Sequence, residues 1–276
     1  MITLLLAGSL SLAPALQDPG PESVDPKVLA QAVEELEEAF KRGESADRLA
    51  AIEKHGAVVD AGVIKWVAKG LADSAREVRA VSIDALRFTE HPHALDALHR
   101  CYKSDRKIEK DAELYAALIR AFAQHGDPES VKLLTSNPLS KGDRNAARAR
   151  LLGLGMIRHR DSVEGVIGLM RKVGRHRAQR HMEDVRTALM VLTGVDHGRS
   201  QDAWNEWWND NKRTLEIQAE PHALPKKAQR EWDRYWGLEP AEEERPAKRR
   251  DGEGRRRGGG DGGDGGGDQS GDGGGS

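Results

Sequence analysis

One stretch, residues 73–100, constrains the fold of this 276-residue chain more than any other. After a polar start, apolar side chains recur at i, i+3, i+7 and i+8, which is the spacing of one face of an amphipathic helix. These side chains are Val78, Val81, Ala85 and Leu86. His91-Pro92 ends this helix, because proline cannot continue a helix and disfavours helical geometry in the residue before it. A second, shorter helix then carries Leu95 and Leu98. The stretch therefore predicts a helical hairpin.

Looser copies of this hairpin follow along the chain. Counted from Val78, they begin at Leu114, Ala147 and Val185, at steps of 36, 33 and 38 residues. Upstream, the pattern predicts three further amphipathic helices at 26–40, 45–56 and 58–70, the first capped by Asp25. Because one hairpin cannot bury its apolar face alone, periods in this range indicate a stack of helical hairpins.

The hairpin also carries a resemblance to a known family. Asp73, Val78-Arg79-Ala80, Ala85-Leu86 and Pro92 together resemble the HEAT-repeat pattern, closest to its short bacterial HEAT-like variety. The likeness covers roughly residues 58–211 and is best in the first copy, since later copies replace the Val-Arg pair. The closing run from Leu192 to Trp208 is similar to the ending of exported HEAT-like proteins of planctomycete-type bacteria.

The resemblance implies an α-solenoid that binds or scaffolds other macromolecules, without a common active site. We therefore expect an all-α fold, a HEAT-like α-α solenoid of about five helical hairpins. Its repeat domain spans residues 25–211, and a C-terminal extension at 212–238 adds one short helix with Trp232 and Trp236 at i, i+4. Residues 239–276 are charged and then almost entirely Gly and Asp, a composition that cannot bury enough surface to fold. We expect a disordered tail there.

The first sixteen residues are apolar and uncharged, and Ala13-Pro14-Ala15 offers a small-x-small cleavage pattern. This segment is short for a membrane span, so it predicts a signal peptide at 1–16, followed by a linker at 17–24. The absence of Lys and Arg at its start leaves two alternatives open, a disordered start or a misassigned initiation site. We expect an exported protein, periplasmic or extracellular, and otherwise a cytoplasmic one.

The strongest candidate binding surface is the basic stretch at 141–180, where eleven Lys and Arg stand against three acidic residues. Stacked repeats would place Arg144, Arg148, Arg158 and Arg175 on one ridge, which would attract phosphate, an acidic polysaccharide or an acidic protein. The alternative is a solvated face that pairs with the acidic first helix or with the Asp-rich tail. The overall net charge of −2 argues against a uniformly basic nucleic-acid binder.

A second candidate is the tryptophan cluster. Trp204, Trp207 and Trp208 share one helical face and offer a binding hot spot or a sugar-stacking platform. The terminal hairpin of a solenoid must also cover the exposed end of the core, and this capping role is the favoured interpretation.

No catalytic, phosphate-binding or metal motif is present in the sequence, and the scattered histidines are best interpreted as polar turn residues. Cys101, the only cysteine, excludes an internal disulfide and is expected to be a small buried hydrophobe. We expect no cofactor, no metal and no transmembrane segment. The predicted protein is a monomeric, non-catalytic scaffold for an unknown protein partner. The rivals are a binder of an anionic polymer through 141–180 and, less favoured, a HEAT-like lyase or glycosylase whose pocket Trp204 to Trp208 would line.

Overall fold

The computed structural model describes residues 25–139, 143–172 and 179–238. Over these ranges the protein is all-helical, with twelve α-helices, two short 3-10 helices and no strand, which confirms the all-α prediction. The predicted signal peptide at 1–16, the linker at 17–24 and the tail at 239–276 lie outside the described residues.

The α-helices follow one another in this order: α1 Pro26–Arg42, α2 Ser45–His55, α3 Ala61–Gly70, α4 Arg76–Arg87, α5 Pro92–Ser104, α6 Ala112–Gln124, α7 Ser130–Thr135, α8 Arg144–Met156, α9 Arg160–Lys172, α11 Met182–Thr193, α12 Gln201–Asn211 and α13 Lys226–Trp236. The two 3-10 helices, Ile108–Lys110 and Gln179–His181, precede α6 and α11.

Short polar side chains start several of these helices, because the first backbone N–H groups of a helix have no partner within it. The Asp25 carboxylate accepts from Lys27 N at 2.8 Å before Pro26 begins α1. Asp111 and Asp143 do the same for α6 and α8. At the other end, α13 stops at Gly237, whose φ of 70° lies in the left-handed region that glycine enters at little cost. The cap at Asp25 was predicted from the sequence.

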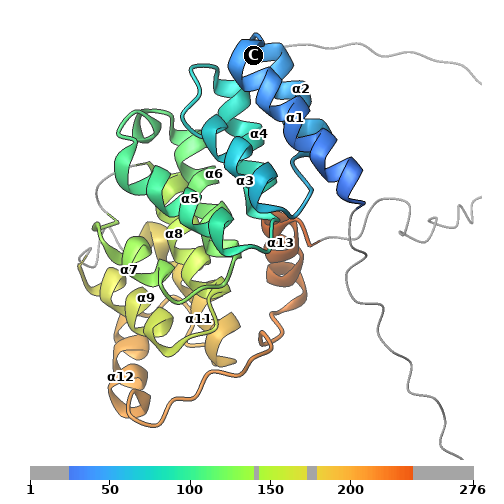
Figure 1. The fold of residues 1–276 in the computed structure, drawn as a ribbon. Helices are drawn as coiled ribbons and strands as arrows, with labels where there is room; N and C mark the ends of the chain where they lie inside the picture. Colours follow the sequence, from blue (N-terminus) through green and yellow to red (C-terminus); the bar gives the residue numbers. More distant parts are fainter. Residues whose placement is uncertain (1–24, 140–142, 173–178, 239–276) are drawn as a thin grey trace, which may run out of the picture.

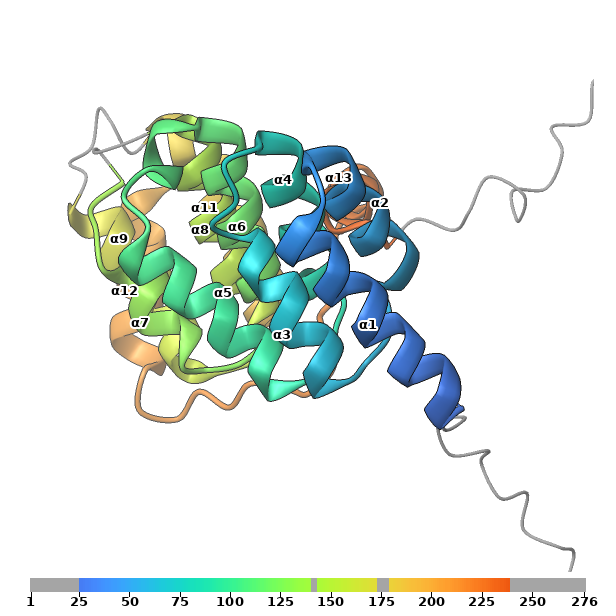
Figure 2. The same cartoon turned by 45° about the horizontal axis from the view of Figure 1, so that its top comes forward.

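The helices are stacked in two rows (Figure 1; Figure 2). One row, called here the inner row, holds α2, α4, α6, α8 and α11, each packed on the next. The outer row holds α1, α3, α5, α7, α9 and α12. Between α5 and α7 the outer row is joined by a buried hydrogen bond of 2.8 Å between His99 Nε2 and Ser130 Oγ. One continuous apolar core fills the space between the rows.

Two helix boundaries differ from the sequence prediction. The first helix of the 73–100 stretch ends at Arg87, before His91-Pro92, and the second is not the shorter one, with 13 residues against 12. Pro92 begins α5, because its missing N–H is not needed in the first helical turn. The helix predicted from residue 58 begins at Ala61, where the Asp60 carboxylate accepts from Gly62 N at 2.6 Å.

The C-terminal extension folds back onto the stack, and α13 lies against the inner row (Figure 1). The Trp236 and Trp232 side chains are 0% and 5% exposed. The Trp232 ring meets α8 and α11 at Gly155, where an added Cβ would lie 3.2 Å from Trp232 Cη2. At the other end of α13, Arg87 Nη2 of α4 donates to the Trp236 carbonyl at 2.7 Å. Thus α13 spans the inner row from α11 to α4.

If α13 holds the inner row together, removing its most buried indole should destabilise the whole chain. We predict that Trp236→Ala lowers the free energy of unfolding by about 3–5 kcal/mol, as for other buried aromatic truncations. Leu238→Ala is the control, because Leu238 is 52% exposed and lies only two residues further along the chain. Urea denaturation measures both variants. A loss of under about 1 kcal/mol in Trp236→Ala would mean that α13 does not brace the stack.

Candidate functional site

The basic stretch does not form one free ridge among the described residues. Arg144, the first residue of α8, is exposed, and its guanidinium makes no hydrogen bond or ion pair with the described residues. Arg148, one turn further along α8, lies between Asp184 of α11 at 3.4 Å and the Tyr235 ring of α13, 5.2 Å from its centroid. Arg175 lies outside the described residues.

Arg158 is used inside the protein. It follows α8 and donates to three backbone carbonyls: Val191 at 2.7 Å, Glu220 at 2.8 Å and Gln218 at 3.0 Å. Two of these carbonyls belong to the C-terminal extension, so Arg158 holds the extension against the end of α11. Arg160 adds a bond of 3.0 Å from its Nε to the Lys212 carbonyl. The guanidiniums of Arg158 and Arg160 thus bind backbone carbonyls of the protein itself, so a ligand would have to compete with these hydrogen bonds.

The tryptophan cluster lies mostly in the core. Trp204 is 0% and Trp208 4% exposed, while Trp207 is half-buried. Trp204 Nε1 donates to the Gly198 carbonyl at 3.0 Å, and its ring meets His197 edge-on. The indoles of Trp204 and Trp208 cover the last outer-row helices, which leaves only Trp207 with a partly open face for stacking a ligand.

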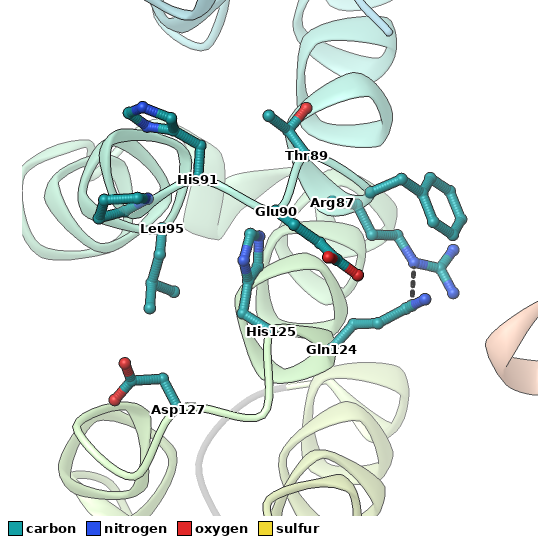
Figure 3. A pocket seen from close by; sticks show the side chains of 10 residues that line it. Arg87, Thr89, Glu90, His91, Leu95, Gln124, His125 and Asp127 are labelled. Carbon is teal, nitrogen blue, oxygen red and sulfur yellow. Dashed lines mark hydrogen bonds between the residues drawn. The ribbon is translucent and has the colours of Figure 1, made fainter. Parts of the chain in front are cut away.

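Two open hollows lie beyond the C-terminal end of α13, on either side of Phe88 at the end of α4. Figure 3 shows the first, a hollow of about 430 Å³ called here the turn hollow. Its lining comes from the α4–α5 turn and from the end of α6, and consists of Arg87, Phe88, Thr89, Glu90, His91, Pro92, Leu95, Gln124, His125 and Asp127.

The polar groups of the turn hollow are held mainly by the protein itself. The Thr89 hydroxyl donates to the Ala85 carbonyl at 2.8 Å, and His125 Nε2 lies 3.0 Å from the Leu86 carbonyl. Burial lowers the pKa of His125 below its usual value, which favours the neutral ring. Arg87 Nε donates to Gln124 Oε1 (dashed in Figure 3). The hydroxyl and the imidazole are thus not paired with each other, and the arrangement suits recognition better than proton transfer.

A second hollow of about 360 Å³ lies on the other side of Phe88, between α2 and α4, and is called here the α2–α4 hollow. Ile52, Gly56, Val81 and Ala85 line it together with Glu53, Ala57 and Asp84, and Phe88 and Thr89 are common to both hollows. The Phe88 ring is 56% exposed, with the Arg87 guanidinium 4.8 Å from its centroid. An aromatic ring with hollows on both sides is the most distinctive surface feature of the described chain.

None of the candidate residues predicted from the sequence is Phe88, Glu53 or Asp84. A signal was present, since Phe88 follows the last position of the apolar stripe of α4 and stands directly before the polar turn Thr89-Glu90-His91. Such a ring is out of phase with the buried face, so it does not enter the core of its own hairpin.

Among residues 25–139, 143–172 and 179–238, no three or more His, Cys, Asp or Glu side chains come close enough to share a metal ion. No helix in these ranges is long and apolar enough to cross a bilayer. Comparison with models of known protein families gives no match, and comparison with curated proteins gives none either.

Arg158 offers a test of how the extension is held. We predict that Arg158→Met lowers the free energy of unfolding by about 1.5–3 kcal/mol, because hydrogen bonds from a charged donor to three carbonyls are lost. Amide exchange at residues 216–222 should accelerate. Arg144→Met is the matched control and should stay within about 0.5 kcal/mol, since the Arg144 side chain is exposed. Equal effects of the two variants would contradict a holding role for Arg158.

Cys101 offers a second test. The side chain is 8% exposed, and burial raises the pKa of its thiol to about 11. Since the thiolate is the reacting species, we predict that a disulfide reagent at pH 8 modifies the folded protein at least about 100-fold more slowly than the guanidinium-unfolded protein. The absorbance of the released thiol reports both rates. Similar rates in the two states would show that Cys101 is accessible.

Proposed function

We propose that this protein is a non-catalytic protein-interaction scaffold built on a HEAT-like α-α solenoid of about five helical hairpins. The hairpins are α2/α3, α4/α5, α6/α7, α8/α9 and α11/α12, with α1 beside the first one. Support for this fold assignment comes from the two rows of stacked helices and from the HEAT-like residues of the 73–100 stretch. A signal peptide at 1–16 would place the scaffold outside the cytoplasm, and a disordered tail at 239–276 would follow it.

One observation carries the functional proposal. Phe88 exposes more than half of its ring between two hollows, at an edge of the stack that α13 leaves open. Large aromatic side chains beside pockets are the usual anchors of protein–protein interfaces, because they bury much area and lose few rotamers on binding. We therefore assign the docking edge for a partner protein to Phe88 and the two hollows that flank it.

The anionic-polymer alternative rests on Arg144, which is exposed on α8 one turn from the half-exposed Arg148. It is weaker than the scaffold proposal, because Arg158 and Arg160 donate to backbone carbonyls of the protein itself. Binding through this surface would be recognised by an affinity that falls steeply with added salt, since each phosphate contact releases a counterion. The lyase or glycosylase alternative has no further observation in its favour.

Removal of Phe88 should separate the docking edge from the rest of the surface. We predict that a partner captured from native cell-envelope extract by the wild-type chain is lost with Phe88→Ser. With the purified partner, the dissociation constant of Phe88→Ser should rise at least about 30-fold, as expected for a hot-spot aromatic worth about 2 kcal/mol. Calorimetric titration of the partner measures the effect.

Val59→Ser is the matched control for Phe88→Ser. Val59 is 55% exposed in the loop between α2 and α3, so Val59→Ser also removes an exposed apolar side chain. It should bind the partner as the wild type does, and both variants should unfold within about 0.5 kcal/mol of the wild type. A partner that binds Phe88→Ser and the wild type equally would overturn the docking-edge assignment.

A further inference from the structure

The α2–α4 hollow has an apolar floor and an acidic rim. Ile52, Val81 and Ala85 form the floor, and Phe88 stands at one side. Glu53 and Asp84 are both exposed, and neither carboxylate makes a hydrogen bond or an ion pair with any of the described residues. Apolar floors favour insertion of an apolar side chain, while unpaired carboxylates at a rim favour a cation beside it.

The acidic character extends around Phe88. Glu90 and Asp127 line the turn hollow on the far side of the ring, so four carboxylates lie in the two hollows together. Arg87 is the only Lys or Arg side chain in either lining. It is nearly buried, and its guanidinium already donates to Gln124 Oε1 and to the Trp236 carbonyl. A ligand approaching Phe88 therefore meets net negative charge.

The neighbouring part of the inner row shows what kind of segment it accepts. There the occupant is α13, a helix that inserts the Trp232 and Trp236 indoles, while its Lys226, Lys227 and Arg230 are exposed. Arg87 contacts both the last carbonyl of α13 and the Phe88 ring, so the α2–α4 hollow begins where α13 ends. The hollow thus continues a surface that already binds the aromatic side chains of a helix within the same chain, and its own carboxylates supply the preference for a basic segment.

We propose that the α2–α4 hollow binds a segment of a partner protein in which one aromatic or aliphatic side chain is flanked by Lys or Arg. The apolar side chain lies against Ile52, Val81 and Phe88, and the flanking cations pair with Glu53 and Asp84. This inference rests on the proposed scaffold function and adds the chemistry of its partner. The four carboxylates disfavour acidic peptides and nucleic acid at this site.

A library of random 12-residue peptides displayed on phage tests the proposal with the full chain as bait. Peptides selected by the wild type and not by Phe88→Ser should be enriched in Lys and Arg within two positions of an aromatic or aliphatic residue. The double variant Glu53→Lys/Asp84→Lys should select peptides enriched in Asp and Glu. Individual peptides, labelled and followed by fluorescence anisotropy, should bind the double variant at least about tenfold more weakly than the wild type.

The double variant Glu206→Lys/Asp210→Lys is the control, because it makes the same charge change on the exposed surface of α12. It should select and bind the same peptides as the wild type. The preference for basic peptides should shrink in about 1 M salt, where charges are screened within about 3 Å. Selection of acidic peptides, of peptides without charge bias, or of none would overturn the inference.

The proposed function and this inference fail separately. If Phe88→Ser loses the natural partner while Glu53→Lys/Asp84→Lys retains it, the docking edge stands and the basic partner is refuted. If neither variant affects the partner, both are refuted. If both variants lose it and Glu206→Lys/Asp210→Lys does not, both are supported.

Discussion

Each helix of this chain has one apolar face, and only the neighbouring helices of the stack can cover it. The contacts run from α1 to α3 and from α2 to α4, and so on along both rows, so that every helix depends on those beside it. Such a stack leaves two apolar surfaces exposed, one at its last hairpin and one along the inner row. The chain covers the first with Trp204 and Trp208 and the second with α13.

The inner surface is where a stack of hairpins would ordinarily offer the most area to a partner, and here most of it is already filled. Trp232 lies in the space left by Gly155, and the Tyr235 ring lies 5.5 Å and 5.2 Å from the guanidiniums of Arg120 and Arg148. Burial raises the pKa of Tyr235 to about 12, so its hydroxyl stays protonated among these cations. The proposed docking edge therefore lies at the α4–α5 turn, where α13 leaves Phe88 uncovered.

The sequence predicts the helices well, because the 3.6-residue period, the aspartate caps and the glycine stops are local signals. The all-α class and the helical hairpin at 73–100 follow from them. Local signals could not predict which groups the arginine side chains contact. A count of charges at 141–180 does not tell whether a guanidinium meets solvent, as Arg144 does, or three backbone carbonyls, as Arg158 does. That distinction depends on where residues 212–222 run, which no periodicity encodes. Phe88 was missed for a related reason, since its exposure depends on where α13 stops.

The hydrogen bond from Arg87 to the Trp236 carbonyl joins residues that are 149 positions apart. During synthesis the ribosome adds about 5–20 residues per second, so α4 waits on the order of ten seconds before its partner exists. In that interval the early hairpins can pack on each other, but the surface of the inner row that α13 will cover remains exposed to water. A stack that would otherwise fold and unfold hairpin by hairpin is thus tied into one cooperative unit only when the last helix arrives. A nascent chain that stalls before residue 226 would lack α13, so the apolar surface of the inner row would be exposed to chaperones and proteases.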